Sequence, residues 1–309
     1  MAAIGAQEVD FRSAIAAVNA TSHLRVYTQD VFGKIRESLY EGSWTNGTSK
    51  NVIATGKLCT PMAATSKQLQ NIRVHYLSEQ NTLKEAAYDS GKGWYDGGMS
   101  SQHFAVAPYS KVAACMLAGF DKLVLRVYAQ IEDNTIQEYG WDSDSSGWRK
   151  MTNLGAAMPG THIGCTSYKT SQLSIRLYIQ NEEGDLVEKC YDANRGWYNG
   201  GLKVPEAPPR AAIAATSFNA TSSSVSIRVY YAGPDDRLLE KAWDGQRWQD
   251  GGFNERSIPG TQVAVVNWGS GPQLNLRVYF QKGEFVSGVS EWAYSSGRWG
   301  AGRNAIPPA

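Results

Sequence analysis

The chain has 309 residues, with 30 lysines and arginines against 29 aspartates and glutamates, and 42% of its residues are apolar. That is enough to bury a large core, in one large all-β domain or in two smaller ones. The balanced charge gives no reason to expect nucleic acid or an anionic membrane surface as a partner. No apolar run approaches the ~18 residues that a spanning helix needs, so we expect no membrane insertion.

Three further features of the sequence exclude common chemistries. The four cysteines show no CxxC spacing, and Cys115 and Cys165 lie in apolar runs, so we expect buried free thiols in a reducing compartment. The four histidines do not cluster with a nucleophile, so we expect no histidine-based triad, no metal site and no cofactor. Residues 1–10 have neither a basic region nor an apolar stretch, and we therefore read no secretory signal.

The sequence is built from a repeat of about 50 residues, a period typical of solenoids and propellers. The first element of each copy is a short apolar strand rich in small residues, which reads IAAVN in the first copy. The six strands occupy residues 15–19, 62–66, 112–116, 163–167, 213–217 and 263–267.

The second element is a strand with an arginine inside a β-branched run, which reads LRVY in the first copy. Leu24 and Val26 share one face of this strand, and Arg25 and Tyr27 share the other, because successive side chains alternate. The six arginines are Arg25, Arg73, Arg126, Arg176, Arg228 and Arg277.

The third and fourth elements carry a glutamate, an aromatic residue and a tryptophan. The glutamates follow the arginines by 12 residues in five copies and by 14 in the last, and they are Glu37, Glu85, Glu138, Glu188, Glu240 and Glu291. Three residues later stand the aromatic residues Tyr40, Tyr88, Trp141, Tyr191, Trp243 and Tyr294. The copies end with a tryptophan near a glycine, at Trp44, Trp94, Trp148, Trp197, Trp248 and Trp299. Pairs such as DN, DG and GG read as turns between these elements.

Each copy therefore predicts about four short antiparallel strands and no helix. A solenoid is the main alternative, but it needs distinct polar caps, and the first and last copies resemble the others. The pattern favours an all-β fold, a single six-bladed β-propeller domain over residues 1–309. We expect the tail, residues 303–309, to meet the N-terminal segment and close the ring. The copies cover approximately 13–60, 61–110, 111–160, 161–210, 211–260 and 261–309.

The even spacing from arginine to glutamate places both side chains on one face of a hairpin. We expect Arg25 to lie directly opposite Glu37, with the turn centred on Val31. The two extra residues of the last copy lengthen its hairpin and keep this parity. The odd spacing of three turns Tyr40 to the other face of the blade. The predicted site therefore lies between blades, with arginine and glutamate from one blade and aromatic residues from the next.

An arginine, a carboxylate and two aromatic rings suit carbohydrate binding. The guanidinium donates hydrogen bonds in a fixed geometry, the carboxylate accepts them from hydroxyls, and aromatic faces cover apolar C–H patches. One alternative is an interaction scaffold that binds no sugar and is held by six ion pairs, although buried ion pairs contribute little stability. The other is a sialidase- or fucosidase-like propeller hydrolase. Hydrolysis needs two carboxyls in different roles, whereas each copy offers one glutamate, whose pKa the arginine should lower.

These residues together resemble the fungal fucose-specific lectins of the Aleuria aurantia lectin type. The resemblance rests on the IRVY-like strand, the glutamate, the aromatic residue and the GW that follows, and it covers nearly all of residues 10–309. It implies a propeller that binds L-fucose and fucosylated glycans non-covalently between adjacent blades, with no catalysis and no required metal. In such lectins the arginine and glutamate bind the sugar's hydroxyl and ring oxygens. The next blade supplies an indole N–H and an aromatic residue against methyl C6.

Carried over by motif, the resemblance implies six pockets, which we number by the blade that supplies the arginine. The first pocket holds Arg25, Glu37, Tyr88 and Trp94, and the second holds Arg73, Glu85, Trp141 and Trp148. The third holds Arg126, Glu138, Tyr191 and Trp197, and the fourth holds Arg176, Glu188, Trp243 and Trp248. The fifth holds Arg228, Glu240, Tyr294 and Trp299, and the sixth holds Arg277, Glu291, Tyr40 and Trp44. One departure from the family pattern is His75, which replaces the usual tyrosine.

Several equivalent sites on one rigid body predict avidity for glycan-covered surfaces and haemagglutination. The resemblance also implies a homodimer. Because we read no secretory signal, we expect a cytoplasmic protein, or one that is released by a non-classical route or associated with the cell wall.

Overall fold

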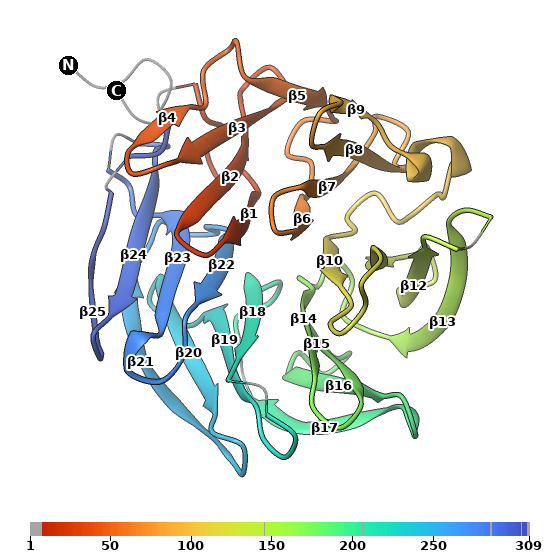
Figure 1. The fold of residues 1–309 in the computed structure, drawn as a ribbon, viewed down its shortest axis with the longest axis vertical. Coiled ribbons are helices and arrows are strands. Elements are labelled where there is room, and N and C mark those ends of the chain that lie inside the picture. The colour runs from red at the N-terminus through yellow and green to blue at the C-terminus, as the bar shows by residue number, and fades with distance from the viewer. Residues whose placement is uncertain are drawn as a thin grey trace.

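Six antiparallel sheets are arranged in a ring around a central axis (Figure 1). We describe them from a computed structural model, which describes residues 8–144, 146–205, 207–219, 221–284, 286–303 and 305–307. Five sheets have four strands. The first has a fifth strand, which follows β4 in the chain and, like β4, pairs with β3. The predicted six-bladed β-propeller is confirmed.

Each blade is formed by consecutive strands, from the inner strand to the outer one. Blade one contains β1 (Ile15–Ala20), β2 (His23–Gln29), β3 (Lys34–Tyr40), β4 (Trp44–Asn46) and β5 (Val52–Thr55). Blade two contains β6 (Ala63–Lys67), β7 (Asn71–Leu77), β8 (Leu83–Asp89) and β9 (Gly93–Asp96), followed by the short helix η1 (Gly98–Gln102). Blade three contains β10 (Val112–Met116), β11 (Val124–Gln130), β12 (Thr135–Asp142) and β13 (Arg149–Ala156). Blade four contains β14 (Gly164–Lys169), β15 (Leu173–Gln180), β16 (Leu186–Asp192) and β17 (Gly196–Val204). Blade five contains β18 (Ile213–Phe218), β19 (Ser226–Ala232), β20 (Arg237–Trp243) and β21 (Trp248–Arg256). Blade six contains β22 (Val263–Trp268), the short helix η2 (Gly271–Gln273), β23 (Asn275–Gln281), β24 (Val289–Ser295) and β25 (Arg298–Ala301).

The inner strands are the small-residue segments of the repeat. They surround a cavity on the axis, and β1 lies against both β6 and β22, so the first and last blades are neighbours. Alanines such as Ala16 and Ala264 let six strands approach one axis, because each blade narrows toward the centre. The small-residue composition therefore follows from the position of these strands.

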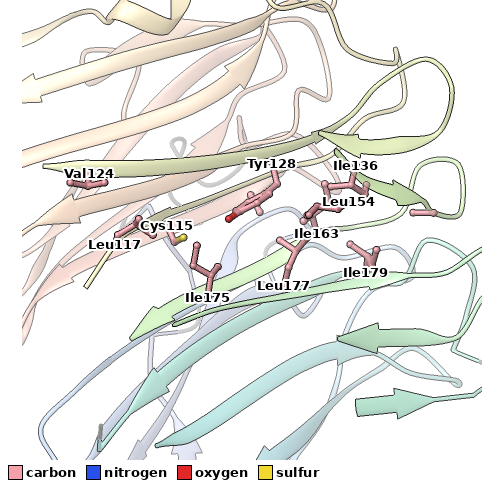
Figure 2. Packing of buried hydrophobic residues seen from close by; sticks show 12 residues of the cluster. Cys115, Leu117, Val124, Tyr128, Ile136, Leu154, Ile163, Ile175, Leu177 and Ile179 are labelled. Atoms are coloured by element: carbon pink, nitrogen blue, oxygen red, sulfur yellow. The ribbon is translucent and has the colours of Figure 1, made fainter. Parts of the chain in front are cut away.

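The apolar core is divided among the interfaces between neighbouring blades. Between blades three and four, Val124 and Tyr128 of β11 face Ile175 and Leu177 of β15 (Figure 2). All four side chains are buried to 6% exposure or less. Polar side chains on these strand faces are therefore buried between two blades, and the predicted pockets lie at the same interfaces.

A buried glutamine four residues after the arginine links most blades to the next inter-blade segment. Gln130 Nε2 donates to Asn134 O (2.9 Å) and Met158 O (3.1 Å), and its Oε1 accepts from Gly160 N (2.8 Å). Gln29 and Gln180 make equivalent bonds at their own junctions. These glutamines satisfy backbone groups that would otherwise be buried without partners.

The same glutamine closes the ring. Gln281 Oε1 accepts from Arg12 N at 2.7 Å, and its Nε2 donates to Asp10 O at 3.0 Å, so blade six holds the N-terminal segment. The tail pairs with its own blade through Val289 and Ile306, and Ile306 also packs in the core cluster that includes Leu24 of blade one. Residues 304, 308 and 309 of the tail, and residues 1–7, lie outside the described residues.

Candidate functional site

The register of the second and third strands differs from the expected pairing. Glu37 lies opposite Tyr27, and Arg25 lies opposite Leu39, so the prediction that Arg25 directly faces Glu37 is wrong by two residues. The same shift occurs in the other five blades. The parity is as expected, so arginine and glutamate share a face as diagonal neighbours, within reach of long side chains.

Four of the six arginines make an ion pair with their glutamate. The Nε–Oε distance is 3.0 Å for Arg228 and Glu240 and 3.2 Å for Arg73 and Glu85. The pairs Arg126–Glu138 and Arg277–Glu291 are at 3.9 Å.

A second carboxylate, four residues after the glutamate, binds the arginine in the first four pockets. Arg25 pairs with Glu41 at 2.6 Å, and Arg73 pairs with Asp89 at 3.0 Å. Asp142 and Asp192 hold Arg126 and Arg176 in the same way, each at 3.1 Å. Our sequence reading missed these residues, although an acidic residue at this spacing recurs in five copies.

The arginines of the last three blades also lie over an aromatic ring from the inner strand. The guanidinium carbons of Arg176, Arg228 and Arg277 lie 5.2, 5.1 and 4.7 Å from the ring centroids. The rings belong to Tyr168, Phe218 and Trp268. In the fifth and sixth pockets this stacking replaces the second carboxylate, because Asp244 binds backbone N–H groups of its own turn and Ser295 has no charge.

Each terminal tryptophan contacts the preceding blade around the ring. It packs edge-on against the side chain that lies opposite the glutamate, with centroids 5.5 to 6.1 Å apart. The pairs are Trp94–Tyr27, Trp148–His75, Trp197–Tyr128, Trp248–Tyr178, Trp299–Tyr230 and Trp44–Tyr279. The last pair joins blade one to blade six, so the structure brings the tryptophans to the six interfaces that parity predicts.

The second aromatic residue of each set stacks beside the tryptophan in five blades. Tyr40, Tyr88, Tyr191, Trp243 and Tyr294 lie 5.4 to 5.6 Å from the tryptophan of their own blade. Trp141 packs against the core cluster that contains Trp148.

All four expected residues line one cavity in the fourth and the fifth pocket. The fourth cavity has a volume of about 440 Å³ and is lined by Arg176, Glu188, Trp243 and Trp248. The fifth, of about 500 Å³, is lined by Arg228, Glu240, Tyr294 and Trp299. In the second pocket the tryptophan also reaches the carboxylate, because Trp148 Nε1 donates to Glu85 Oε2 at 3.1 Å.

Strand glycines leave room for the carboxylates of the glutamates, and we call these seating glycines. The prediction that GG marks a turn is wrong for the glycine pairs in β17 and β21, which lie inside strands. A Cβ on Gly200 would lie 2.2 Å from Glu188 Oε2, and one on Gly251 would lie 2.2 Å from Glu240 Oε1. The next backbone N–H, that of Gly201, donates to Glu188 Oε2 at 3.0 Å. A strand glycine here marks the close approach of a carboxylate.

We expect Gly200→Ala to weaken fucose binding in the fourth pocket at least tenfold, because the methyl group displaces the Glu188 carboxylate. Hydrogen bonds to charged groups are worth about 1.5–3 kcal/mol, so the loss of one suffices. The control is Gly300→Ala in β25, whose Cβ meets nothing within 4 Å and which does not line the fourth cavity. Calorimetric titration with methyl α-L-fucoside measures both variants, and equal binding by the two would contradict the seating role.

Burial sets the electrostatics of the glutamates. It raises the pKa of Glu37, Glu85, Glu138, Glu240 and Glu291, and the neighbouring arginine only partly opposes this. The expectation that arginine lowers the pKa of these glutamates is therefore wrong, since desolvation outweighs the ion pair.

Other expectations concern side chains outside the pockets. All four cysteines are free thiols, with Cys115 and Cys190 buried, Cys165 half-buried and Cys59 exposed. Within the described residues, no group of three or more His, Cys, Asp or Glu side chains is arranged to hold a metal ion. No helix among them is long and apolar enough to cross a membrane.

Comparison with known proteins agrees with this geometry. Residues 9–309 match the sequence model of the family described as fungal fucose-specific lectin. The chain is 52% identical to a fucose-specific lectin of Aspergillus fumigatus over 319 residues, which cover 100% of both chains. It is 35% identical to the fucose-specific lectin of Aleuria aurantia over 269 residues, 84% of this chain and 67% of the other.

Solved structures show the same fold. The SapL1 lectin, in complex with alpha methyl fucoside, superposes with a TM-score of 0.91 and 47% identity, over 99% of this chain and 100% of the other. The six-bladed propeller of Aleuria aurantia lectin superposes with a TM-score of 0.82 and 31% identity, over 97% and 98% of the two chains. This chain therefore belongs to the fungal fucose-specific lectin family.

Proposed function

We propose that this protein is a multivalent lectin that binds L-fucose and fucosylated glycans non-covalently in six pockets between adjacent blades. The observation that carries the proposal is the convergence of arginine, glutamate and two aromatic residues from two blades on one cavity, as in the fourth and fifth pockets. The family supports fucose as the sugar, since SapL1 lectin has been solved with a fucoside bound.

The chemistry of the pocket supports distinct roles for the predicted residues. The guanidinium, fixed by its carboxylate or aromatic support, donates to hydroxyl and ring oxygens of the sugar. The glutamate, seated on glycine, accepts from hydroxyls, which bind a carboxylate strongly. The two aromatic rings cover the apolar side of fucose with its methyl group, and the indole N–H adds a donor.

The three candidate functions differ in a titration with methyl α-L-fucoside. A lectin is expected to bind close to six fucosides per chain, and methyl α-D-galactoside serves as the control sugar. Turnover of an aryl fucoside or sialoside would indicate a hydrolase, and we assign no catalysis because the family is one of lectins. A scaffold would give no heat with the fucoside, and Arg25→Ala would then change stability alone.

Two further properties belong to this proposal. We propose a homodimer, supported by the exposed apolar side chains of Val31, Phe32 and Leu58 at one end of blade one. Light scattering on the purified chain tests it, and a monomeric mass would contradict it. We also propose that the protein is cytoplasmic, or is released by a non-classical route or associated with the cell wall, which cell fractionation tests.

A further inference from the structure

The six pockets differ in the charge around their arginine. In the first, second and fourth, the guanidinium lies between the buried glutamate and the second carboxylate, so the carboxylates outnumber it by one. In the third, Arg149 also pairs with Asp142 and balances the charge. Among the described residues, Arg228 of the fifth pocket and Arg277 of the sixth pair only with their glutamate. An anionic ligand is therefore repelled less in the last two pockets than in the first, the second and the fourth.

The fifth pocket also has a cation on its rim. Arg298, immediately before Trp299, lines the cavity together with Arg228 and Glu240. Its side chain is exposed, and no acidic group of the described chain pairs with it. The equivalent arginine beside the fourth pocket, Arg247, lies near Asp244, with Nε 3.9 Å from Oδ2.

The sequence of the last blade explains why Arg298 is free of an acidic partner. Ser295 in blade six occupies the repeat position that Asp244 occupies in blade five. The cavity has one other acidic side chain besides Glu240, and that is Asp250, which pairs with Lys241 Nζ at 2.5 Å. With these two ion pairs balanced, Arg298 leaves the fifth pocket with a net positive charge.

We propose that the fifth pocket is a subsite for fucosylated glycans that carry an anionic group, a carboxylate or a sulfate, on a sugar close to fucose. This inference rests on the proposed function, because fucose itself would occupy the inner part beside Arg228, Glu240 and Trp299. The anionic group of the nearby sugar would pair with the Arg298 guanidinium at the rim. Guanidinium suits both groups because its planar fork donates two parallel hydrogen bonds to a carboxylate or a sulfate.

The expected gain in affinity for an anionic glycan is modest because Arg298 is exposed. An exposed ion pair corresponds to about a two- to fivefold change in affinity, and it is screened at an ionic strength of about 0.15 M and above. The preference must therefore be read pocket by pocket, since five other sites would mask it in a bulk titration.

The terminal tryptophans allow such a measurement. We would label the full chain with 5-fluorotryptophan and assign the ¹⁹F resonance of each terminal tryptophan by its replacement with phenylalanine. A neutral fucosylated trisaccharide is then compared with its sialylated and its sulfated forms at low salt. We expect the Trp299 resonance to titrate at a two- to fivefold lower concentration with one or both anionic forms. The Trp94 resonance of the first pocket is expected to titrate at a higher concentration with the anionic forms than with the neutral one. The two arms separate a carboxylate-specific rim from one that accepts any anion.

Arg298→Gln is expected to remove the preference at Trp299 while leaving methyl α-L-fucoside binding there unchanged. Arg247→Gln is the matched control and is expected to change no preference. Failure of methyl α-L-fucoside to move any of the six resonances would overturn the proposed function itself. Normal fucoside titration, with Trp299 showing no preference or one that survives Arg298→Gln, would overturn this inference alone.

Discussion

Replacement of Arg228 by methionine is expected to remove one fucose site and to leave the other five unchanged. The variant loses the guanidinium that pairs with Glu240 at 3.0 Å while keeping an unbranched side chain over Phe218. Each hydrogen bond from a charged donor to the sugar is worth about 1.5–3 kcal/mol, so two lost bonds weaken the pocket by about 100-fold or more. Calorimetry with methyl α-L-fucoside should then report five sites per chain instead of six.

The same variant tests the interpretation that the ion pairs only support the fold. Glu240 is 5% exposed, and without its cation we expect it to take up a proton at higher pH than in the wild type. The stability cost is therefore about 1–3 kcal/mol, and the protein stays folded. The control is Arg195→Met, which removes an exposed arginine stacked on Tyr198 outside the predicted sets. Six sites in the Arg228→Met variant would contradict our assignment of the fifth pocket.

Agglutination should respond more steeply than sugar binding to successive arginine replacements. Cross-linking needs at least two occupied sites that face different cells, and each retained pocket raises the effective concentration of the others. We expect a chain with one intact pocket to bind fucoside with unchanged affinity and to agglutinate no erythrocytes, unless a dimer supplies a second pocket. The ratio of agglutination to fucoside binding in this one-pocket chain therefore also reports the oligomeric state.

The arrangement of the blades was predictable because it depends on period and parity alone. Six copies spaced by about 50 residues predict six blades. Parity assigns Trp94 to the interface that contains Arg25 and Glu37, and the contact of Trp94 with Tyr27 agrees. Parity also leaves the register uncertain by any even number of residues, which is why Arg25 lies opposite Leu39 instead of Glu37.

The details of the pockets depend on how deeply each side chain is buried and on which atoms approach each other closely. The period of the repeat reveals neither. The raised pKa of Glu85 follows from its burial beneath Trp148 and the backbone of Met99, and no spacing reveals that burial. The seating glycine Gly200 was visible in the sequence but reads equally well as a turn. The second carboxylate, Asp192 in the fourth pocket, has an acidic counterpart in four other copies, and a search for every repeated charge would have found it.

His75 is expected to make the protein labile to mild acid. It stands in β7 opposite Glu85, where the other five blades have a buried tyrosine, and its side chain is fully buried against Trp148. Neither ring nitrogen has a hydrogen-bond partner among the described residues. Burial, together with the positive charge of Arg73, lowers the pKa of His75 to about 3 from an ordinary value of 6.5.

The sign of the pH dependence follows from that difference in pKa. Above about pH 6.5 the imidazole is neutral in the folded and the unfolded chain, so it contributes no pH dependence. Between about pH 6.5 and 3 the unfolded chain binds a proton that the folded chain does not, and the free energy of unfolding falls by about 1.4 kcal/mol per pH unit. The loss reaches roughly 3 kcal/mol at pH 4.5. Glu85 acts in the opposite direction, because its raised pKa favours the folded state as the pH falls.

A comparison of variants separates the histidine from these carboxylates. His75→Tyr restores the tyrosine of the other blades, where hydroxyls such as that of Tyr128 donate to the glutamate (3.0 Å to Glu138), and His75→Phe removes the titrating group without adding a hydroxyl. Both variants should lose the part of the stability difference between pH 7 and pH 4.5 that His75 contributes, as measured by urea denaturation, whatever their stability at pH 7. His103→Asn is the control, since His103 is exposed and its backbone has a φ of 51°, which asparagine tolerates. The wild-type curve should fall more steeply with acid than both His75 variants, because only the wild-type unfolded chain gains the proton of residue 75. Parallel curves for the wild type and both variants would show that the buried imidazole is protonated in the folded state, with Glu85 opposite as its counter-charge.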